Sequence, residues 1–328
     1  MSLSRIGVML VLCITLVGSS AGQMPEQNKT PGGNVPPTSL DVGQLLAAQR
    51  YDDLDHAIDA ARSQKTRGPG GVWQLYLIDE AIHKAAKENS EVLEQVQKWA
   101  AARPESTAAR IALAEAYVAV GFKSRGTGDA DSVTDAGWKD LADNGDRAVA
   151  TLKQLTGAGG DPHVSSVLME IALAQGWDNA TTRQIYEHAL AAEPAYYHTF
   201  RQYALYLLPK WYGEGTSAED MAEDLYGRVG GKEGLFLYFE VGTVIGCDCG
   251  PAPLLEPMSW ERVKAGYKAL QELYGATNRD HNRFALLAFA HGDKPAARAA
   301  FKSITAFDRD VWNTQLGFEK AKGWAQQP

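Results

Sequence analysis

Apolar residues recur every three or four positions through most of the chain, which is the spacing of amphipathic helices. Val92, Val96 and Trp99 follow this spacing, and Pro104 stands where such a helix would end. No segment alternates apolar and polar residues over a sustained length. The short run Leu235 to Val244, rich in apolar and aromatic residues, is the one place where a strand is an alternative to a helix. The pattern therefore predicts an all-α protein.

The helical pattern also repeats, with large and small apolar residues in similar relative places. Three copies show this, and they contain, in order, Leu113, Ala114, Tyr117 and Gly121; Thr182, Tyr186, Ala189, Leu190 and Pro194; Phe284, Ala285, Ala288, Gly292, Ala297, Phe301 and Ile304. Since one helix pair cannot cover its own apolar face, neighbouring pairs must stack. The repeats predict a tetratricopeptide-like α-solenoid of antiparallel helix pairs.

This repeat register assigns individual positions. Ala114 and Ala285 are the small residues at which paired helices come close, and the larger side chains that fill the space beside them are Tyr117, Tyr186 and Phe301. On the same helices, Glu115 and Lys302 are expected to face solvent.

The first residues have the features of a secretory signal. One positive charge, Arg5, precedes an apolar run from Ile6 to Val17, and small residues precede a cleavage site near Ala21. Because the run is shorter than the roughly 20 residues of a membrane span, we expect cleavage, with a retained N-terminal anchor as the alternative. Cys13 lies inside the apolar run and is not expected to be lipidated. The sequence thus predicts a periplasmic or secreted protein with no transmembrane segment after signal removal.

The composition divides the remaining chain into two parts. Residues 22–41 are rich in Pro, Gly, Asn, Gln and Thr and have little to bury, so we expect a disordered linker. Residues 42–324 have a globular composition and form the predicted helical-repeat domain. The formal net charge is -8 and no Lys/Arg block stands out, which argues against a nucleic-acid partner.

Two cysteines remain after signal removal, Cys247 and Cys249, in a Cys-Asp-Cys segment. They could form a strained disulfide, remain free thiols or bind a soft metal, although a structural zinc site needs four ligands. The fold itself must be held by packing, because two thiols do not make a disulfide framework.

The sequence contains no recognisable catalytic or cofactor motif. The Asp-rich segment Gly126 to Asp135 places Val133 at the third ligand position of a calcium loop, and Asp140 in place of the usual Glu at the last position, so Thr134 or Asp135 is instead expected to cap the following helix. There is no nucleophile elbow and no His-Glu-x-x-His pair, and the glycines at 157, 159 and 160 lack the rest of a phosphate-binding loop. We expect no metal, no cofactor and no catalytic residues.

An aromatic cluster between Tyr196 and Tyr212 is the best candidate for a binding surface. Tyr203 shares a helix stripe with apolar neighbours and is expected in the core. The residues left for another face or for the following loop are Tyr197, Arg201, Trp211 and Tyr212. Exposed Tyr, Trp and Arg are the residue types that dominate recognition surfaces.

Several segments together resemble a bacterial family of tetratricopeptide-like proteins, domain of unknown function 4034. The specific segments are Arg125-Gly-Thr-Gly-Asp-Ala130 and Leu208-Pro-Lys-Trp211, supported by Gly70-Gly-Val-Trp73 and Asn282-Arg-Phe284. The resemblance extends over most of Leu45 to Trp312. It implies a helical-repeat fold and supplies no activity.

These observations favour a scaffold or adaptor that binds a protein or peptide partner in the cell envelope. Two alternatives remain open: a small-molecule or glycan-binding module with a deep polar pocket, and an enzyme whose site is assembled from distant helices.

Overall fold

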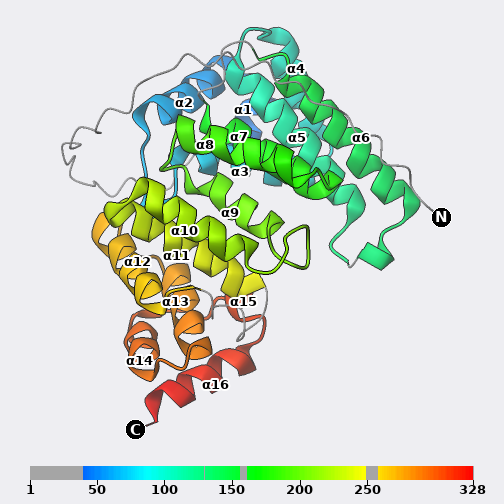
Figure 1. Cartoon of the computed structure of the whole chain (residues 1–328). Coiled ribbons are helices and arrows are strands. Elements are labelled where there is room, and N and C mark those ends of the chain that lie inside the picture. Colours follow the sequence, from blue (N-terminus) through cyan, green and yellow to red (C-terminus); the bar gives the residue numbers. More distant parts are fainter. Residues whose placement is uncertain (1–39, 129, 156–160, 249–257, 328) are drawn as a thin grey trace. The chain divides into compact units, whose positions relative to one another are not determined.

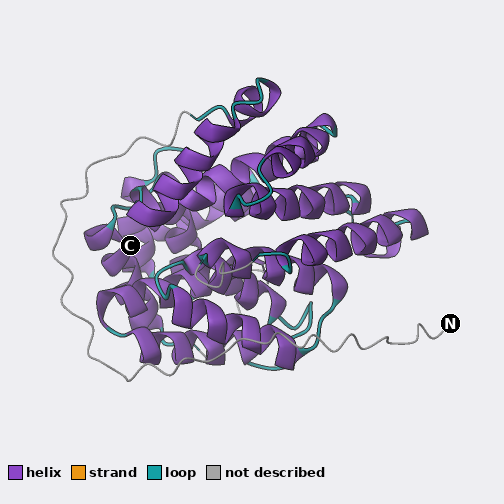
Figure 2. Cartoon of the chain, turned by 90° about the horizontal axis from the view of Figure 1, so that it is seen from above, coloured by secondary structure: helices purple, strands orange, loops and turns teal. Residues whose placement is uncertain are grey.

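A computed structural model of the chain describes residues 40–128, 130–155, 161–248 and 258–327. These residues form helices joined by loops, with no strand among them and one isolated bridge between Arg67 and Trp73 (Figure 2). The predicted all-α class is confirmed, and the run Leu235 to Val244 is helical. The predicted signal segment and nearly all of the predicted linker lie outside the described residues.

The described residues form sixteen α-helices (Figure 1). The first nine are α1 (Val42–Ala47), α2 (Tyr51–Gln64), α3 (Gln74–Glu88), α4 (Glu91–Ala102), α5 (Thr107–Arg125), α6 (Asp135–Leu152), α7 (Pro162–Gln175), α8 (Asn179–Ala192) and α9 (Tyr197–Tyr206). The others are α10 (Ser217–Val229), α11 (Gly231–Asp248), α12 (Trp260–Leu273), α13 (Asn278–Ala290), α14 (Lys294–Ser303), α15 (Arg309–Trp312) and α16 (Gln315–Gln326). None of these described helices is both long and apolar enough to cross a bilayer.

Side-chain caps fix where several helices begin. Ser106 accepts a hydrogen bond from the Ala109 N–H at the start of α5, and Asp178 accepts one from the Thr181 N–H at the start of α8. Thr134, one of the two capping residues that the sequence predicts, accepts from the Gly137 N–H at the start of α6. These bonds satisfy N–H groups that have no partner within the helix.

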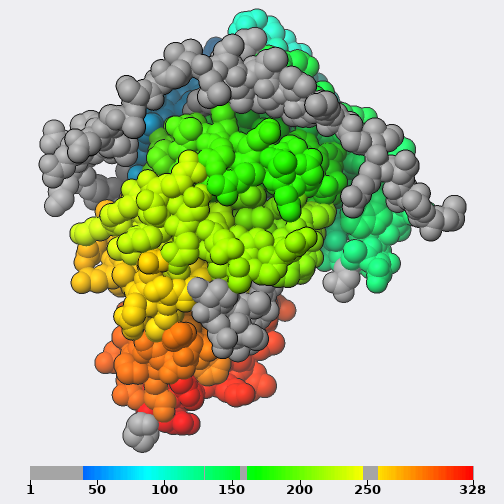
Figure 3. Space-filling model, viewed as in Figure 1, coloured from blue at the N-terminus to red at the C-terminus, as the bar shows by residue number. Residues whose placement is uncertain are grey.

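The odd-numbered helices from α3 to α13 form a row in which each packs against the next. Even-numbered neighbours pack beside them: α4 and α6 on α5, α8 on α7, α10 and α12 on α11, and α14 on α13. In the space-filling view, the green and yellow-green segments that include α8 and α10 meet side chain against side chain (Figure 3). Because α5 packs against α2, α3, α4, α6 and α7, nearly every face of this helix is covered.

The main apolar core runs through the described helices from Val42 to Ala325. A second, smaller cluster, which includes Ala114, joins α5, α6 and α7. The predicted contact residues Ala114 and Ala285 are fully buried, whereas Lys302 is exposed, as expected. The expectation for Glu115 is wrong, since this residue is only 3% exposed. The physical reason is that neighbouring helices cover α5 on every side at Glu115, so no side of the helix there faces solvent.

Candidate functional site

Polar and ionisable side chains from four helices meet inside the row formed by α3, α5, α7 and α9. On α3 they are Tyr76, Asp79, Glu80 and His83; on α5, Glu115; on α7, His163, Ser166 and Glu170; on α9, His198, Arg201 and Gln202. The spacings on α3 and α7 are three, four and seven residues, which place the side chains on one helix face. This group of residues is called the polar pocket below.

Glu115 lies at the centre of the polar pocket and contacts two histidines. His83 Nδ1 is 2.6 Å from Glu115 Oε1, and His163 Nε2 is 3.4 Å from Glu115 Oε2. Burial by itself would raise the pKa of the Glu115 carboxyl, but the two imidazoles outweigh burial and lower the pKa to about 2. Glu115 is therefore ionised at neutral pH, and it acts as the counter-ion of both histidines.

His163 is buried between two carboxylates and a tyrosine. Its Nε2 lies 3.7 Å from Asp79 Oδ2, and its Nδ1 lies 2.9 Å from the Tyr196 hydroxyl. Burial opposes the charged imidazolium, but Asp79 and Glu115 outweigh burial and raise the pKa of His163 to about 10. Burial also raises the pKa of Asp79, to about 7. The positive charge of His163 is thus held deep in the protein by two acidic groups.

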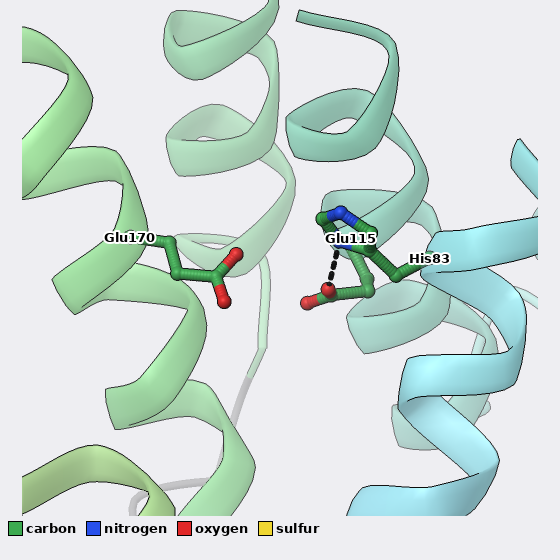
Figure 4. Close-up of side chains that lie close together, drawn as sticks. All are labelled: His83, Glu115 and Glu170. Carbon is green, nitrogen blue, oxygen red and sulfur yellow. Dashed lines mark hydrogen bonds and ion pairs between the residues drawn. The ribbon is translucent and has the colours of Figure 1, made fainter. Parts of the chain in front are cut away.

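Glu170 approaches this group from α7, with its carboxylate directed towards Glu115 (Figure 4). Its Oε1 accepts a hydrogen bond from Gln202 Nε2 at 3.0 Å, whereas Oε2 is buried without a partner. Burial, and then the charge of Glu115, raise the pKa of Glu170 to about 8. Two carboxyl groups in one site therefore have opposite shifts, a pattern that is common where proteins bind ligands or transfer protons.

His198 closes the polar pocket from α9. Its ring stacks on Tyr76 with centroids 3.6 Å apart and planes 5° apart. Burial, and then the nearby charges of Arg201 and His163, keep the pKa of His198 well below its ordinary value. His198 is therefore neutral, and its buried Nε2 has no hydrogen-bond partner.

The side chains of the polar pocket, except Asp79 and His83, line a cavity of about 60 Å³. Two buried atoms that line it, Glu170 Oε2 and His198 Nε2, have no hydrogen-bond partner and no ion-pair partner. Asp79 Oδ2 and His163 Nε2 also lack a hydrogen bond, but they form an ion pair with each other at 3.7 Å. Buried polar atoms in native proteins nearly always have a partner, supplied by protein, water or ligand. A cavity of this size has room for a few water molecules or for one ion with its remaining water.

A larger groove of about 720 Å³ lies outside the polar pocket, between α2 and the segment that joins α4 to α5. The groove is acidic, because Asp52, Asp55 and Asp59 of α2 line it together with His56. Arg62 also lines the groove and bonds Asp161 and Asp59, each at 2.5 Å. Much of the negative charge of the groove is therefore already paired with arginine or open to solvent.

The four residues predicted for binding do not lie on one surface. Tyr197 is buried, at 5% exposure, and packs edge-on against Phe236. Arg201 lines the polar pocket, and its Nη1 bonds Glu240 and Thr243. Trp211 and Tyr212 are partly exposed in the loop after α9.

Other predicted features lie at the edge of the described residues or outside them. Cys247 is in the last turn of α11, and Cys249 lies outside the described residues, as do the glycines at 157, 159 and 160. The three alternatives for Cys247 and Cys249, a disulfide, free thiols or a bound metal, therefore all stay open predictions.

Sequence reasoning missed the residues at the centre of the polar pocket: His83, Glu115, His163 and Glu170. Their signal was present but weak, because each ionisable residue stands within a helix whose neighbouring positions are apolar, as in Ile82-His83 and Leu168-Met-Glu170. Such a residue is ordinarily read as a solvated position. Only the packing of α5 between its neighbours shows that these positions face inward.

The comparisons with known proteins bear on the first half of the described helices. Residues 39–176 match the family described as "Domain of unknown function (DUF4034)", so the resemblance inferred from the sequence is confirmed over that segment. His83, Glu115 and Glu170 all lie within it. Comparison with curated proteins gave no match, and neither did comparison with solved structures.

Proposed function

We propose, for a chain whose residues 39–176 match a family without an assigned activity, that the helical domain is a ligand-binding module. The ligand is a small polar species that occupies the polar pocket. One observation supports this proposal above others: two buried polar atoms that line one cavity, Glu170 Oε2 and His198 Nε2, have no partner. Each such atom costs roughly 1–3 kcal/mol of stability. Proteins commonly retain unfavourable groups of this kind where function requires them.

The proposal distinguishes this pocket from a polar network that only stabilises the fold. In a stabilising network, removing a member lowers stability, because its partners lose their bonds. In a binding site without its ligand, removing an unpartnered polar atom raises stability. His198 is the best position for this test, because it is neutral, stacked on Tyr76 and close in shape to phenylalanine.

We expect His198→Phe to raise the melting temperature of the chain in the presence of EDTA. One kcal/mol corresponds to roughly 2–4 °C for a domain of this order of size, so a rise of a few degrees should be measurable by calorimetry. The matched control is His281→Phe, which removes the bond between His281 Nδ1 and the Tyr267 hydroxyl, 2.5 Å apart. The control should lower the melting temperature. A loss of stability in His198→Phe as large as that in the control would contradict the proposal.

A second candidate function is an exported adaptor, in which a tetratricopeptide-like array of helix pairs binds a peptide or protein. Two observations favour it: the row of odd-numbered helices with partners packed beside them, and the partial exposure of Trp211 and Tyr212 after α9. The secretory character of residues 1–21 supports export to the periplasm or beyond. The two candidates are compatible, because the polar pocket and the loop after α9 use different residues.

A further inference from the structure

We infer that the polar pocket holds a divalent transition-metal ion ligated by His83, Glu115 and Glu170. This inference rests on the proposed ligand-binding role of the pocket and names its ligand. The three residues come from α3, α5 and α7, so no short sequence motif could indicate the site.

The geometry of the three side chains is close to that of a metal site. Each offers one ligand atom, and these atoms all lie within 4.8 Å of one another. Around a tetrahedral ion with bonds of about 2.0–2.2 Å, ligand atoms are separated by roughly 3.4 Å. Figure 4 shows the carboxylate of Glu170 facing Glu115 and His83 across a gap. Small rotations of the side chains would bring all three donors onto one ion.

An unpartnered buried atom points to a missing ligand at this place. Glu170 Oε2 is buried without a partner, although Oε1 of the same carboxylate is bonded to Gln202. The Nε2 atom of His163, a residue only 4% exposed, pairs with one of the proposed ligands instead. It lies 3.4 Å from Glu115 Oε2. An imidazole in that position can orient a ligating carboxylate, which is the usual role of the groups behind metal ligands.

The donor set favours transition metals over calcium or magnesium. One imidazole and two carboxylates suit Zn²⁺, Mn²⁺ or Fe²⁺, whereas Ca²⁺ takes six to eight oxygen ligands. Three protein ligands leave one position for water, and Glu115 and Glu170 line a cavity of about 60 Å³ in which that water fits. The two carboxylates also balance the charge of a dication.

The competing explanation is an ion pair that needs no metal. The ion pair of His83 and Glu115, at 2.6 Å, would by itself explain why those two residues lie together. It does not account for Glu170, whose carboxyl is brought by a different helix to the same place and is left half-bonded. Glu170 is therefore the residue that separates the two explanations.

Zinc is the probe for the test. The full-length chain is stripped with EDTA, dialysed and titrated with ZnCl₂ in a calorimeter. We expect one Zn²⁺ per chain with a dissociation constant at or below about 1 μM, which corresponds to roughly -8 kcal/mol. Replacement by Co²⁺ should give the visible absorption of an ion bound by nitrogen and oxygen with fewer than six ligands.

Three variants locate the bound ion. Glu170→Gln and His83→Gln should each weaken zinc binding by at least about 10- to 100-fold, the range found even for groups one step removed from a metal. His56→Ala is the control, because His56 lies in the acidic groove with Asp52, Asp55 and Asp59, where zinc could bind adventitiously. This variant should bind zinc as the unchanged chain does. Melting curves in EDTA establish that each variant is folded.

Three results would overturn the inference: no zinc binding to the unchanged chain, zinc binding by both ligand variants that is as tight as that of the unchanged chain, or loss of binding in His56→Ala alone. If a ligand variant does not fold, the cobalt spectrum of the unchanged chain decides, since a spectrum like that of hydrated Co²⁺ also overturns it. Failure of zinc binding leaves the ligand-binding proposal intact if His198→Phe still raises the melting temperature. If zinc does not bind and His198→Phe also lowers the melting temperature, the metal inference and the ligand-binding proposal are both contradicted.

Discussion

At the scale of single residues, Glu115 shows how far burial changes the meaning of a side chain. Its neighbours along α5 are alanines and its position in the repeat register suggested solvent, yet it is 3% exposed. Two histidines contact it, and its pKa falls to about 2 in spite of burial. A buried carboxylate without such partners would be neutral or would destabilise the fold. The charge of Glu115 is therefore tied to the positions of His83 and His163.

This pairing predicts a large effect of a small change. Glu115→Gln keeps the shape of the side chain but leaves the imidazolium groups of His83 and His163 without their common counter-ion. Breaking a buried pair in this way costs about 3–5 kcal/mol. We expect a loss of that order in the free energy of unfolding, measured with urea in EDTA at neutral pH.

Lys302 provides the contrast, because it is exposed on α14. Lys302→Ala should change the free energy of unfolding by no more than about 0.5 kcal/mol. Equal and small effects at Glu115 and Lys302 would mean that Glu115 does not carry a buried charge.

At the scale of helices, close approach decides which small residues can be replaced. α11 and α12 pack so closely at Gly266 that an added Cβ would lie 2.3 Å from the Leu235 carbonyl oxygen and 2.8 Å from Phe239 Cβ. The first contact is with backbone, which cannot rotate away. In contrast, a Cβ at Gly227 on α10 would meet nothing within 4 Å.

The two glycines therefore predict opposite responses to the same substitution. Gly266→Ala should lower the free energy of unfolding by about 1–3 kcal/mol or more, because α11 and α12 must move apart. Gly227→Ala should raise it by roughly 0.5–1 kcal/mol, since alanine is the better helix former in an exposed position. Denaturant unfolding of both variants measures the difference. A neutral Gly266→Ala would show that α11 and α12 do not pack at this distance.

At the scale of the whole molecule, the family match and the core have different extents. Residues 39–176 match the family, whereas the apolar core continues to Ala325. The polar pocket also crosses the end of the match, because His198, Arg201 and Gln202 come from α9. The segment that matches the family therefore does not contain every wall of the candidate site.

Export is the prediction that concerns the chain as a whole. The apolar run from Ile6 to Val17 and the small residues up to Ala21 predict cleavage, which leaves a chain beginning near Gly22. Cell fractionation followed by N-terminal sequencing should place this processed chain in the envelope or the medium. An intact Met1 on protein in the cytoplasm would contradict it.

The sequence by itself determined the helical class, the buried alanines at Ala114 and Ala285, and a helix cap at Thr134 or Asp135. These features depend on residues near one another in the chain, because helix periodicity and capping act over three or four positions. It also contained the family resemblance, which is a pattern of short segments.

The polar pocket was decided only by the tertiary structure. His83, Glu115 and Glu170 are separated by 32 and then 55 residues, and each looks like an ordinary polar position on its own helix. Only the packing of α3, α5 and α7 turns these positions towards one another, and only burial gives their charges the shifted pKa values that mark them as a site.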